Sequence, residues 1–156
     1  MLRADMVQAY VIDLLKRLTG STVSPDADGD LPVHYQGGAF FVRVVGNDGN
    51  PLVQVFAVAV AGLAPSPGLY EALNGINTQL QFARAFHVQE QVLIESEMFG
   101  ADVNPANFEH ACRYVAGATD AFGKRLVESF GGRPFFEERK TEAYDEHYPR
   151  GLGGYL

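Results

Sequence analysis

The sequence is poor in cysteine, in positive charge and in long apolar runs. Its single cysteine, Cys112, cannot form an internal disulfide, which fits a reducing compartment. The formal net charge of -7 disfavours binding to nucleic acids and anionic lipids, because both reward clustered Lys and Arg. No apolar run is long enough to span a bilayer, and the N-terminal residues do not resemble a secretory signal. We therefore expect a cytoplasmic protein with neither nucleic-acid nor membrane partners.

Motifs that bind nucleotides or metals are missing too. The sequence has no Gly-x-x-x-x-Gly-Lys and no Gly-x-Gly-x-x-Gly between a strand and a helix, and its histidines lack the spacing of metal ligands. His110 and Cys112 lie two apart on a predicted helix, so they point to different sides and cannot form a nucleophile and base pair. Cys112 is instead expected in the core. These observations predict a protein that is not an enzyme and that needs no cofactor and no metal.

Acidic residues alternate at Asp26, Asp28 and Asp30, as they do at the start of a calcium-binding EF-hand loop. The loop glycine, Gly29, comes two positions early, and the twelfth position is Gly37 where a bidentate Glu is needed. The interpretation that remains is a solvated acidic loop.

A second acidic pair, Glu95 and Glu97, lies two residues apart on a predicted strand and therefore shares one face. With His87 it could form an acid and base site, but nothing in the sequence would hold it in a dry cleft. A role facing solvent or a second subunit is the stronger expectation.

The first half of the chain predicts a helix followed by a meander of strands. Apolar residues at helical spacing over 6–18 end at Gly20. Strand-like segments follow at 31–36, 39–45 and 52–61, the last two separated by the turn sequence Gly-Asn-Asp-Gly-Asn-Pro. The third segment shows little polar alternation, which is typical of a central strand covered on both faces. Helices can cover one face, and a second subunit is a candidate for the other.

A second helix is predicted to begin near Gly68, with Ser66 as its N-cap and Pro67 in its first turn. Its interior holds Asn74, Gly75 and Asn77, which are poor helix formers. We expect a tertiary contact to favour them, either a close backbone approach at Gly75 or a side-chain amide bonding to a strand.

A hairpin is predicted over 82–99, and two registers are possible. A three-residue loop at 89–91 sorts apolar from polar side chains best and is preferred; it places Phe82 and Phe86 with Ile94 on one face. A two-residue loop would place Arg84 opposite Glu95 and is ranked second.

Asn104 and Pro105 open a long helix over 105–130 with apolar residues at heptad-like spacing. Its small residues would let another element approach closely; they are Ala111, Ala116, Gly117, Ala118 and Ala121. Residues 1–132 are thus expected to form one domain. Residues 133–156 form a mixed-charge tail that is rich in aromatic residues, which is either docked or disordered.

This order of elements is accompanied by a short motif in which LNGIN at 73–77 leads into FARAF at 82–86. In both respects the sequence resembles the YbjN family, a branch of the type III secretion chaperone-like superfamily, where an "LN..N" helix leads into an "F.R" strand, a hairpin and an alanine-rich helix. The resemblance covers most of residues 1–130. The matching residues are Leu73, Asn74, Asn77, Phe82, Ala83, Arg84, Phe86, Val92, Glu97 and the 105–130 helix.

The resemblance implies an α+β domain with helices packed on a twisted antiparallel sheet. It further implies a non-enzymatic homodimer that binds extended peptide segments of partner proteins; members have also been labelled sensory transduction regulators. Peptides can add a strand to an exposed sheet edge while apolar pockets take alternate side chains. The candidate peptide-binding residues are Phe40, Val42, Phe56, Phe82, Arg84 and Phe86. The aromatic tail after Gly132 departs from the family outline.

One alternative function is a small-ligand sensor, in which Tyr70, Asn74, His87 or Arg84 would contact a ligand in an apolar pocket between sheet and helices.

Overall fold

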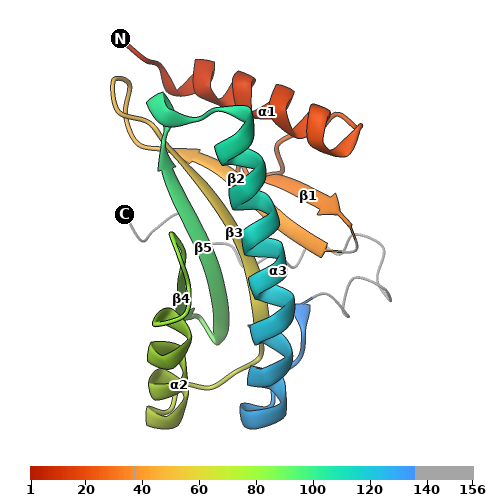
Figure 1. The fold of residues 1–156 in the computed structure, drawn as a ribbon, viewed down its shortest axis with the longest axis vertical. Helices are drawn as coiled ribbons and strands as arrows, with labels where there is room; N and C mark the ends of the chain where they lie inside the picture. The colour runs from red at the N-terminus through yellow and green to blue at the C-terminus, as the bar shows by residue number, and fades with distance from the viewer. Residues whose placement is uncertain (37, 136–156) are drawn as a thin grey trace.

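An antiparallel sheet of five strands, in the order β1-β2-β3-β5-β4, organises the part of the chain that the computed structural model describes, residues 1–36 and 38–135 (Figure 1). The central position of β3 confirms the prediction from its continuous apolar sequence. The strands are β1 (Leu31–Tyr35), β2 (Gly38–Val45), β3 (Leu52–Ala61), β4 (Arg84–Val88) and β5 (Gln91–Phe99).

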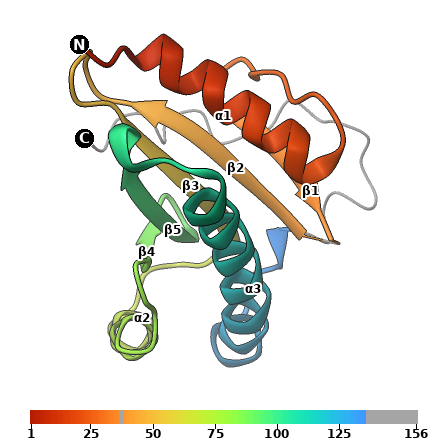
Figure 2. The same cartoon turned by 45° about the horizontal axis from the view of Figure 1, so that its top comes forward.

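The helices are α1 (Ala4–Thr19), α2 (Pro67–Asn77) and α3 (Pro105–Phe130), with a 3-10 turn, η1, at Gly100–Asp102. They lie on one side of the sheet: α1 packs on β1 and β2, α3 runs along β3, and α2 lies beside β4 (Figures 1 and 2). The predicted α+β class and element order are confirmed.

The starts of α2 and α3 and the end of α1 lie where the sequence predicts. The Ser66 hydroxyl accepts a hydrogen bond from the backbone N–H of Leu69 at 3.1 Å, and the Asn104 side chain accepts one from Asn107 N–H at 3.0 Å. Each bond satisfies an N–H that the first helical turn leaves without a partner. Gly20 ends α1 at φ 77°, a conformation that favours glycine.

The main core lies between the sheet and the two helices α1 and α3. Phe40 and Val42 belong to it and are 0% exposed, so the expectation that they lie on an accessible surface is wrong. Side chains alternate along a strand, and the even-numbered members of β2 face the helices. Their neighbours Phe41 and Arg43 face the other way. Burying a side chain as large as Phe contributes about 3 kcal/mol.

The closest approach of a helix to the sheet occurs at Gly123 of α3. A Cβ added there would lie 2.9 Å from the carbonyl oxygen of Ala59 on β3. Gly117, one of the small residues predicted to permit such an approach, has open space around it. The prediction holds at Ala116, whose Cβ would lie 3.5 Å from a Cβ on Gly38 of β2, but it missed Gly123, where α3 meets β3.

The unusual residues of α2 are explained by an amide that bonds to a strand. The Asn77 side chain donates to the carbonyl of Ala85 at 2.9 Å and accepts from its N–H at 2.7 Å. This confirms one of the expected alternatives. The other is wrong, because nothing lies near the position a Cβ would take on Gly75.

The hairpin has the register that was ranked second. Arg84 pairs with Glu95 and Phe86 with Leu93, around a two-residue loop of Gln89 and Glu90. Both loop residues have positive φ, 49° and 58°, which is the conformation of a type I′ turn. The preferred register assumed that one face of the hairpin is polar, whereas apolar side chains pack on both faces of this sheet.

Candidate functional site

The face of the sheet opposite the helices carries the most varied chemistry in the molecule, and we call it the open face. Its apolar cluster includes no residue of α1, α2 or α3. Strand register places on it alternate residues of four strands, which form an apolar half and a polar half. The open face is made by Phe41, Arg43, Gln54, Phe56, Val58, Arg84, Phe86, Val88, Leu93, Glu95 and Glu97.

The apolar half is built around a pair of stacked rings. Phe41 of β2 and Phe56 of β3 are paired in register, with ring centroids 5.5 Å apart and an interplanar angle of 24°. Val58, Leu93 and Phe86 continue this surface across β3, β5 and β4. Phe41, Phe56, Val58 and Leu93 are at most 5% exposed, so the half-buried Phe86 is the ring that an extended peptide would contact first.

The polar half is a cluster of carboxylates around one guanidinium. Arg84 Nη2 lies 3.3 Å from Glu95 Oε1 and 3.5 Å from Glu97 Oε1. Gln54 donates to Glu97 at 2.6 Å from the neighbouring strand. The guanidinium also lies over the Phe86 ring, 5.3 Å from its centroid, so the two halves meet at Arg84.

The two carboxyl groups have opposite pKa shifts. Burial raises the pKa of Glu95 to about 7, and the hydrogen bond and charge of Glu97 raise it further, while Arg84 opposes the shift. Burial also tends to raise the pKa of Glu97. Hydrogen bonds from Gln54 and Glu95 and the charge of Arg84 outweigh it and hold that pKa below its ordinary value. Near neutral pH Glu95 is therefore close to its own pKa, while Glu97 is ionised.

Glu95 does not face solvent, one of the two roles expected for it, because only 8% of its side chain is exposed. The acid and base site considered above is not assembled either. His87 is on the helix-covered side of β4, where its ring bonds the carbonyl of Leu63 at 2.6 Å, whereas both carboxylates are on the open face.

The acidic loop before β1 is only partly solvated, which corrects the expectation. Asp26 accepts from the N–H groups of Asp28 and Asp30, each at 2.9 Å, and so closes the turn. The Asp30 side chain is fully buried and forms a two-pronged ion pair with Arg43 of the open face. Arg43 in turn covers the Phe56 ring, 5.1 Å from its centroid. The loop therefore supports the open face from its β2 side.

The predicted peptide-binding residues divide between the faces. Phe56, Arg84 and Phe86 are brought together on the open face, while Phe40 and Val42 lie in the core. Phe82 precedes β4 at φ 53° and is 93% exposed, with its carbonyl accepting from Ser96 at 2.7 Å. Phe41 and Arg43 were missed, although alternation along β2 would have found them once either neighbour was known to be buried.

The edges of the sheet are poorly suited to strand addition. On β4 the outward N–H and C=O groups of Ala85 are occupied by Asn77. On β1, Pro32 has no N–H to donate to another strand. A peptide recognised by this sheet would therefore find more available chemistry across its open face than along its edges.

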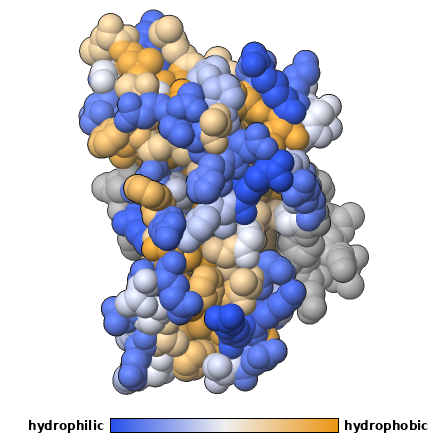
Figure 3. All heavy atoms as spheres, in the orientation of Figure 1, coloured by the Kyte–Doolittle hydropathy of each residue, from blue (hydrophilic) through white to orange (hydrophobic). Residues whose placement is uncertain are grey.

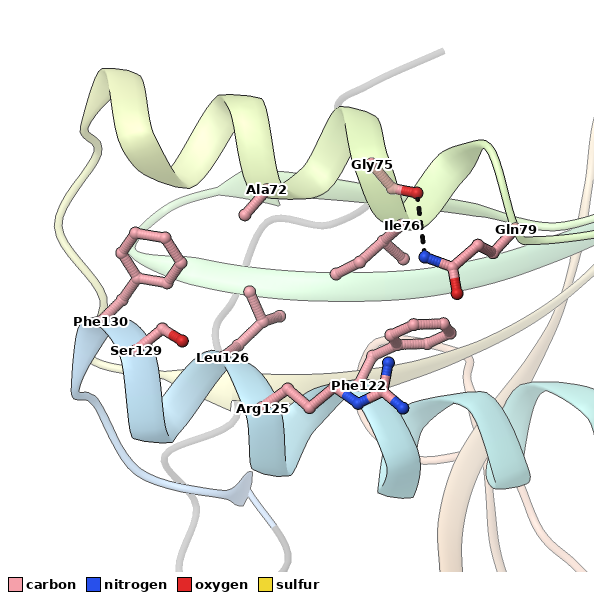
Figure 4. Close-up of a pocket in the computed structure, with 9 residues that line it drawn as sticks. All are labelled: Ala72, Gly75, Ile76, Gln79, Phe122, Arg125, Leu126, Ser129 and Phe130. Atoms are coloured by element: carbon pink, nitrogen blue, oxygen red, sulfur yellow. Dashed lines mark hydrogen bonds between the residues drawn. The ribbon is translucent and has the colours of Figure 1, made fainter.

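A separate groove, which sequence reasoning missed, lies between α2 and α3 and has a volume of about 220 Å³ (Figure 4). Ile76 of α2 and Phe122, Leu126 and Phe130 of α3 line it, and apolar atoms are visible there between polar flanks (Figure 3). Tyr70, Asn74, His87 and Arg84, the residues expected to contact a small ligand, do not line it. The apolar stripe predicted for the 105–130 helix was the signal in the sequence that could have indicated this groove.

Other chemistry is sparse in the described part of the chain. Within residues 1–36 and 38–135, no group of three or more His, Cys, Asp or Glu side chains could hold a metal ion. Cys112 is fully buried, and burial raises the pKa of its thiol to about 12, as befits a core residue. No helix in these residues is both long enough and apolar enough to cross a membrane.

Comparisons with solved structures find the same fold elsewhere. A chain from the crystal structure of the ExsC–ExsE complex has a TM-score of 0.60 at 13% sequence identity, over 81% of this chain and 97% of that one. A chain of the heterodimeric ExoU–SpcU complex from the type III secretion system of Pseudomonas aeruginosa gives a TM-score of 0.49 at 16% identity, over 77% of this chain and 97% of that chain. Comparison with curated protein sequences finds no match.

A family model matches residues 5–138, which is most of the chain. The match includes all the described strands and nearly all of the three helices. The chain therefore belongs to the TY-Chap1 family, the T3SS (YopN, CesT) and YbjN peptide-binding chaperone 1 family.

Proposed function

We propose that this protein is a non-enzymatic, cytoplasmic chaperone-like adaptor whose open face binds extended peptide segments of partner proteins. The observation that carries the proposal is the composition of that face. Phe56 and Phe86 provide apolar contacts, and Arg84 lies between them and the carboxylates of Glu95 and Glu97. An extended segment with apolar and charged side chains would match both halves.

Two comparisons support this proposal. The family description names peptide binding as the activity of its members. The structure with the same fold is a complex of ExsC with ExsE, and thus an example of this fold in a protein–protein assembly. At 13% identity that second comparison supports the fold, while the family supports the class of ligand.

We also propose that the protein acts as a homodimer through the groove between α2 and α3. If the open face holds a client, a second copy must use another surface, and this groove is apolar and accessible. Ala72 lies at its rim and is half-buried, so Ala72→Arg would obstruct the groove with little effect on the core. Light scattering should give a dimer for the unaltered protein and a monomer for this variant. A monomer at all concentrations would overturn the dimer.

Peptide binding can be tested without knowing the client. A displayed library of random peptides, each about a dozen residues long, would be selected on the purified protein, and the affinity of the enriched peptides measured by fluorescence anisotropy. We expect Phe86→Asp and Arg84→Glu to weaken binding by about tenfold or more, since central interface residues often contribute above 1.4 kcal/mol.

Tyr70 provides the matched control, because it is 52% exposed on α2, on the other side of the sheet. Tyr70→Asp should leave the affinity unchanged. Equal loss from Tyr70→Asp and Phe86→Asp, or no enriched peptide at all, would contradict binding at the open face.

A further inference from the structure

The chain leaves α3 by a tight path that leads around the end of β3. Gly131 and Gly132 have φ values of 84° and 73°, and a Cβ on Gly132 would lie 2.7 Å from a side-chain atom of Val60. The next residue, Arg133, forms an antiparallel bridge with Ala61, with both N–H to C=O distances equal to 2.9 Å. This bridge anchors the chain to the last residue of the central strand.

Two residues later the chain has reached the open face. The ring of Phe135 lies 6.4 Å from that of Phe41 in an edge arrangement, and it packs against the apolar cluster of the open face. Since α3 is on the opposite side, residues 131–135 carry the chain from one face of the sheet to the other. Everything after Phe135 therefore starts from the middle of the candidate binding surface.

The 21 residues of 136–156 have the length and composition to occupy this surface. Extended at about 3.3 Å per residue they could cross five strands, spaced about 4.8 Å apart, more than once. Their apolar side chains are aromatic or aliphatic and well separated, and two cations follow the first of them. The relevant residues are Phe136, Arg139, Lys140, Tyr144, Tyr148 and Tyr155.

The charges of the segment are mixed, with the cations Arg139, Lys140 and Arg150 among five carboxylates, and the first two cations are the ones that could meet the polar half. On the open face Glu95 and Glu97 share the single guanidinium of Arg84, while Arg43 is paired with Asp30. Above the pKa of Glu95, about 7, Arg84, Glu95 and Glu97 together carry a net negative charge. Arg139 and Lys140 lie four and five residues beyond Phe135, within about 17 Å of extended chain. The family match ends at residue 138, so most of this segment lies outside it.

We propose that residues 136–156 bind the open face of their own chain as an intramolecular substitute for a client, with the aromatic side chains on the apolar half and Arg139 and Lys140 beside Glu95 and Glu97. The segment would then limit access of peptides to the face. This inference rests on the proposed function only for its consequence, since docking of the segment can be observed with no client present.

The competition follows from simple linkage. A tethered segment acts at an effective concentration of order millimolar, so even weak docking occupies most of the molecules. The apparent affinity for an added peptide is the intrinsic affinity multiplied by the fraction of molecules whose open face is unoccupied. A segment docked in about nine molecules of ten would weaken peptide binding about tenfold.

The docking test uses the full chain carrying a photoreactive phenylalanine analogue at position 86, in the middle of the open face, or at Tyr70 as the control. Position 88 serves as a second open-face site in case the first variant is unstable. After irradiation, mass spectrometry of the monomeric band should find cross-links from 86 or 88 to residues 136–156, and none from position 70. No such cross-links, or cross-links only between two chains, would overturn the proposal.

The competition test replaces Phe136, Tyr144, Tyr148 and Tyr155 by Ser in the full chain. The cross-links should disappear, and library-selected peptides should bind about tenfold more tightly than to the unaltered protein. If the variant bound peptides no more tightly than the unaltered protein, although the unaltered protein gave the cross-links, the blocking role would be overturned. If neither protein binds any peptide while the cross-links form, the proposed function fails but docking stands. If peptides bind both equally and no cross-links form, docking fails and the proposed function stands.

Discussion

The two faces of the sheet use the same strands for different purposes. The face under α1 and α3 is filled almost entirely by aliphatic and aromatic side chains, including Phe40 and Val42 at 0% exposure. The open face combines rings with ion pairs and amides, from Phe56 to Glu97. A core that is apolar throughout gives stability, whereas mixed chemistry leaves bonding capacity for a ligand. On this comparison, the proposed peptide binding belongs to the face without helices.

The largest expected effect contrasts a ring on each face. Phe40→Ala should lower the free energy of unfolding by about 3–5 kcal/mol, since it leaves a cavity in the main core. Phe86→Ala, on the half-buried open face, should cost about 1 kcal/mol while weakening peptide binding. Urea denaturation followed by circular dichroism measures both. Similar losses from the two variants would remove the distinction between the faces.

The next effect concerns β4, the strand at one edge of the sheet, whose side chains reach both faces. Asn77→Ala removes both hydrogen bonds to Ala85 and should destabilise by about 1–3 kcal/mol, because the buried backbone groups lose their partners. Asn74→Ala, at an exposed position on the same helix, is the control and should be nearly neutral. Faster amide exchange across β4 in the first variant alone would support the edge-capping role. Equal exchange in both would contradict it.

A smaller effect tests how closely α3 approaches the helix-covered face. Gly123→Ala places a methyl group against the carbonyl of Ala59 and should cost about 1–3 kcal/mol in thermal unfolding. Gly117→Ala meets nothing and should instead stabilise the helix by about 0.5–1 kcal/mol. If both substitutions were stabilising, α3 would not be held tightly on β3.

The last effect is a pH dependence that the open face produces. The folded-state pKa of Glu95, about 7, is above the unfolded value of 4.5, so its protonated form stabilises the fold below pH 4.5 and that contribution is lost as pH rises through 7. Glu95→Gln should therefore flatten the pH dependence of the free energy of unfolding across this window, by at most about 3 kcal/mol between its ends.

Glu97 supplies the opposite slope as a control for that experiment. Its pKa is lowered, so its ionised form stabilises the fold above pH 4.5, and the contribution is lost as pH falls below that value. Glu97→Gln should change the profile on the acidic side. A Glu95→Gln profile that stays parallel to that of the unaltered protein between pH 4.5 and 7 would contradict the raised pKa.

Local sequence determined the elements of this protein because their signals act over a few residues. Ser66 with Pro67, and Asn104 with Pro105, set the helix starts, and the apolar run of β3 predicted its central place. The motif at 73–86 was sufficient to identify the family that the comparison confirms. Of the predicted peptide-binding residues, Arg84 is exposed and Phe86 half-buried on the open face, whereas Phe56 is 5% exposed there and Phe40 and Val42 lie in the core; their role in peptide binding stays a prediction.

What remained undecided needed long-range contacts. The apolar pattern could not say which side of β2 would face the helices, so Phe40 was placed on the wrong side and Phe41 was missed. The hairpin register depended on the positive φ of Gln89 and Glu90 and on Arg84 meeting Glu95. Residues 136–156 lie outside the described residues, and their docking stays a proposal. The tertiary structure decided these points because side-chain alternation gives two equivalent faces, and only packing against another element distinguishes them.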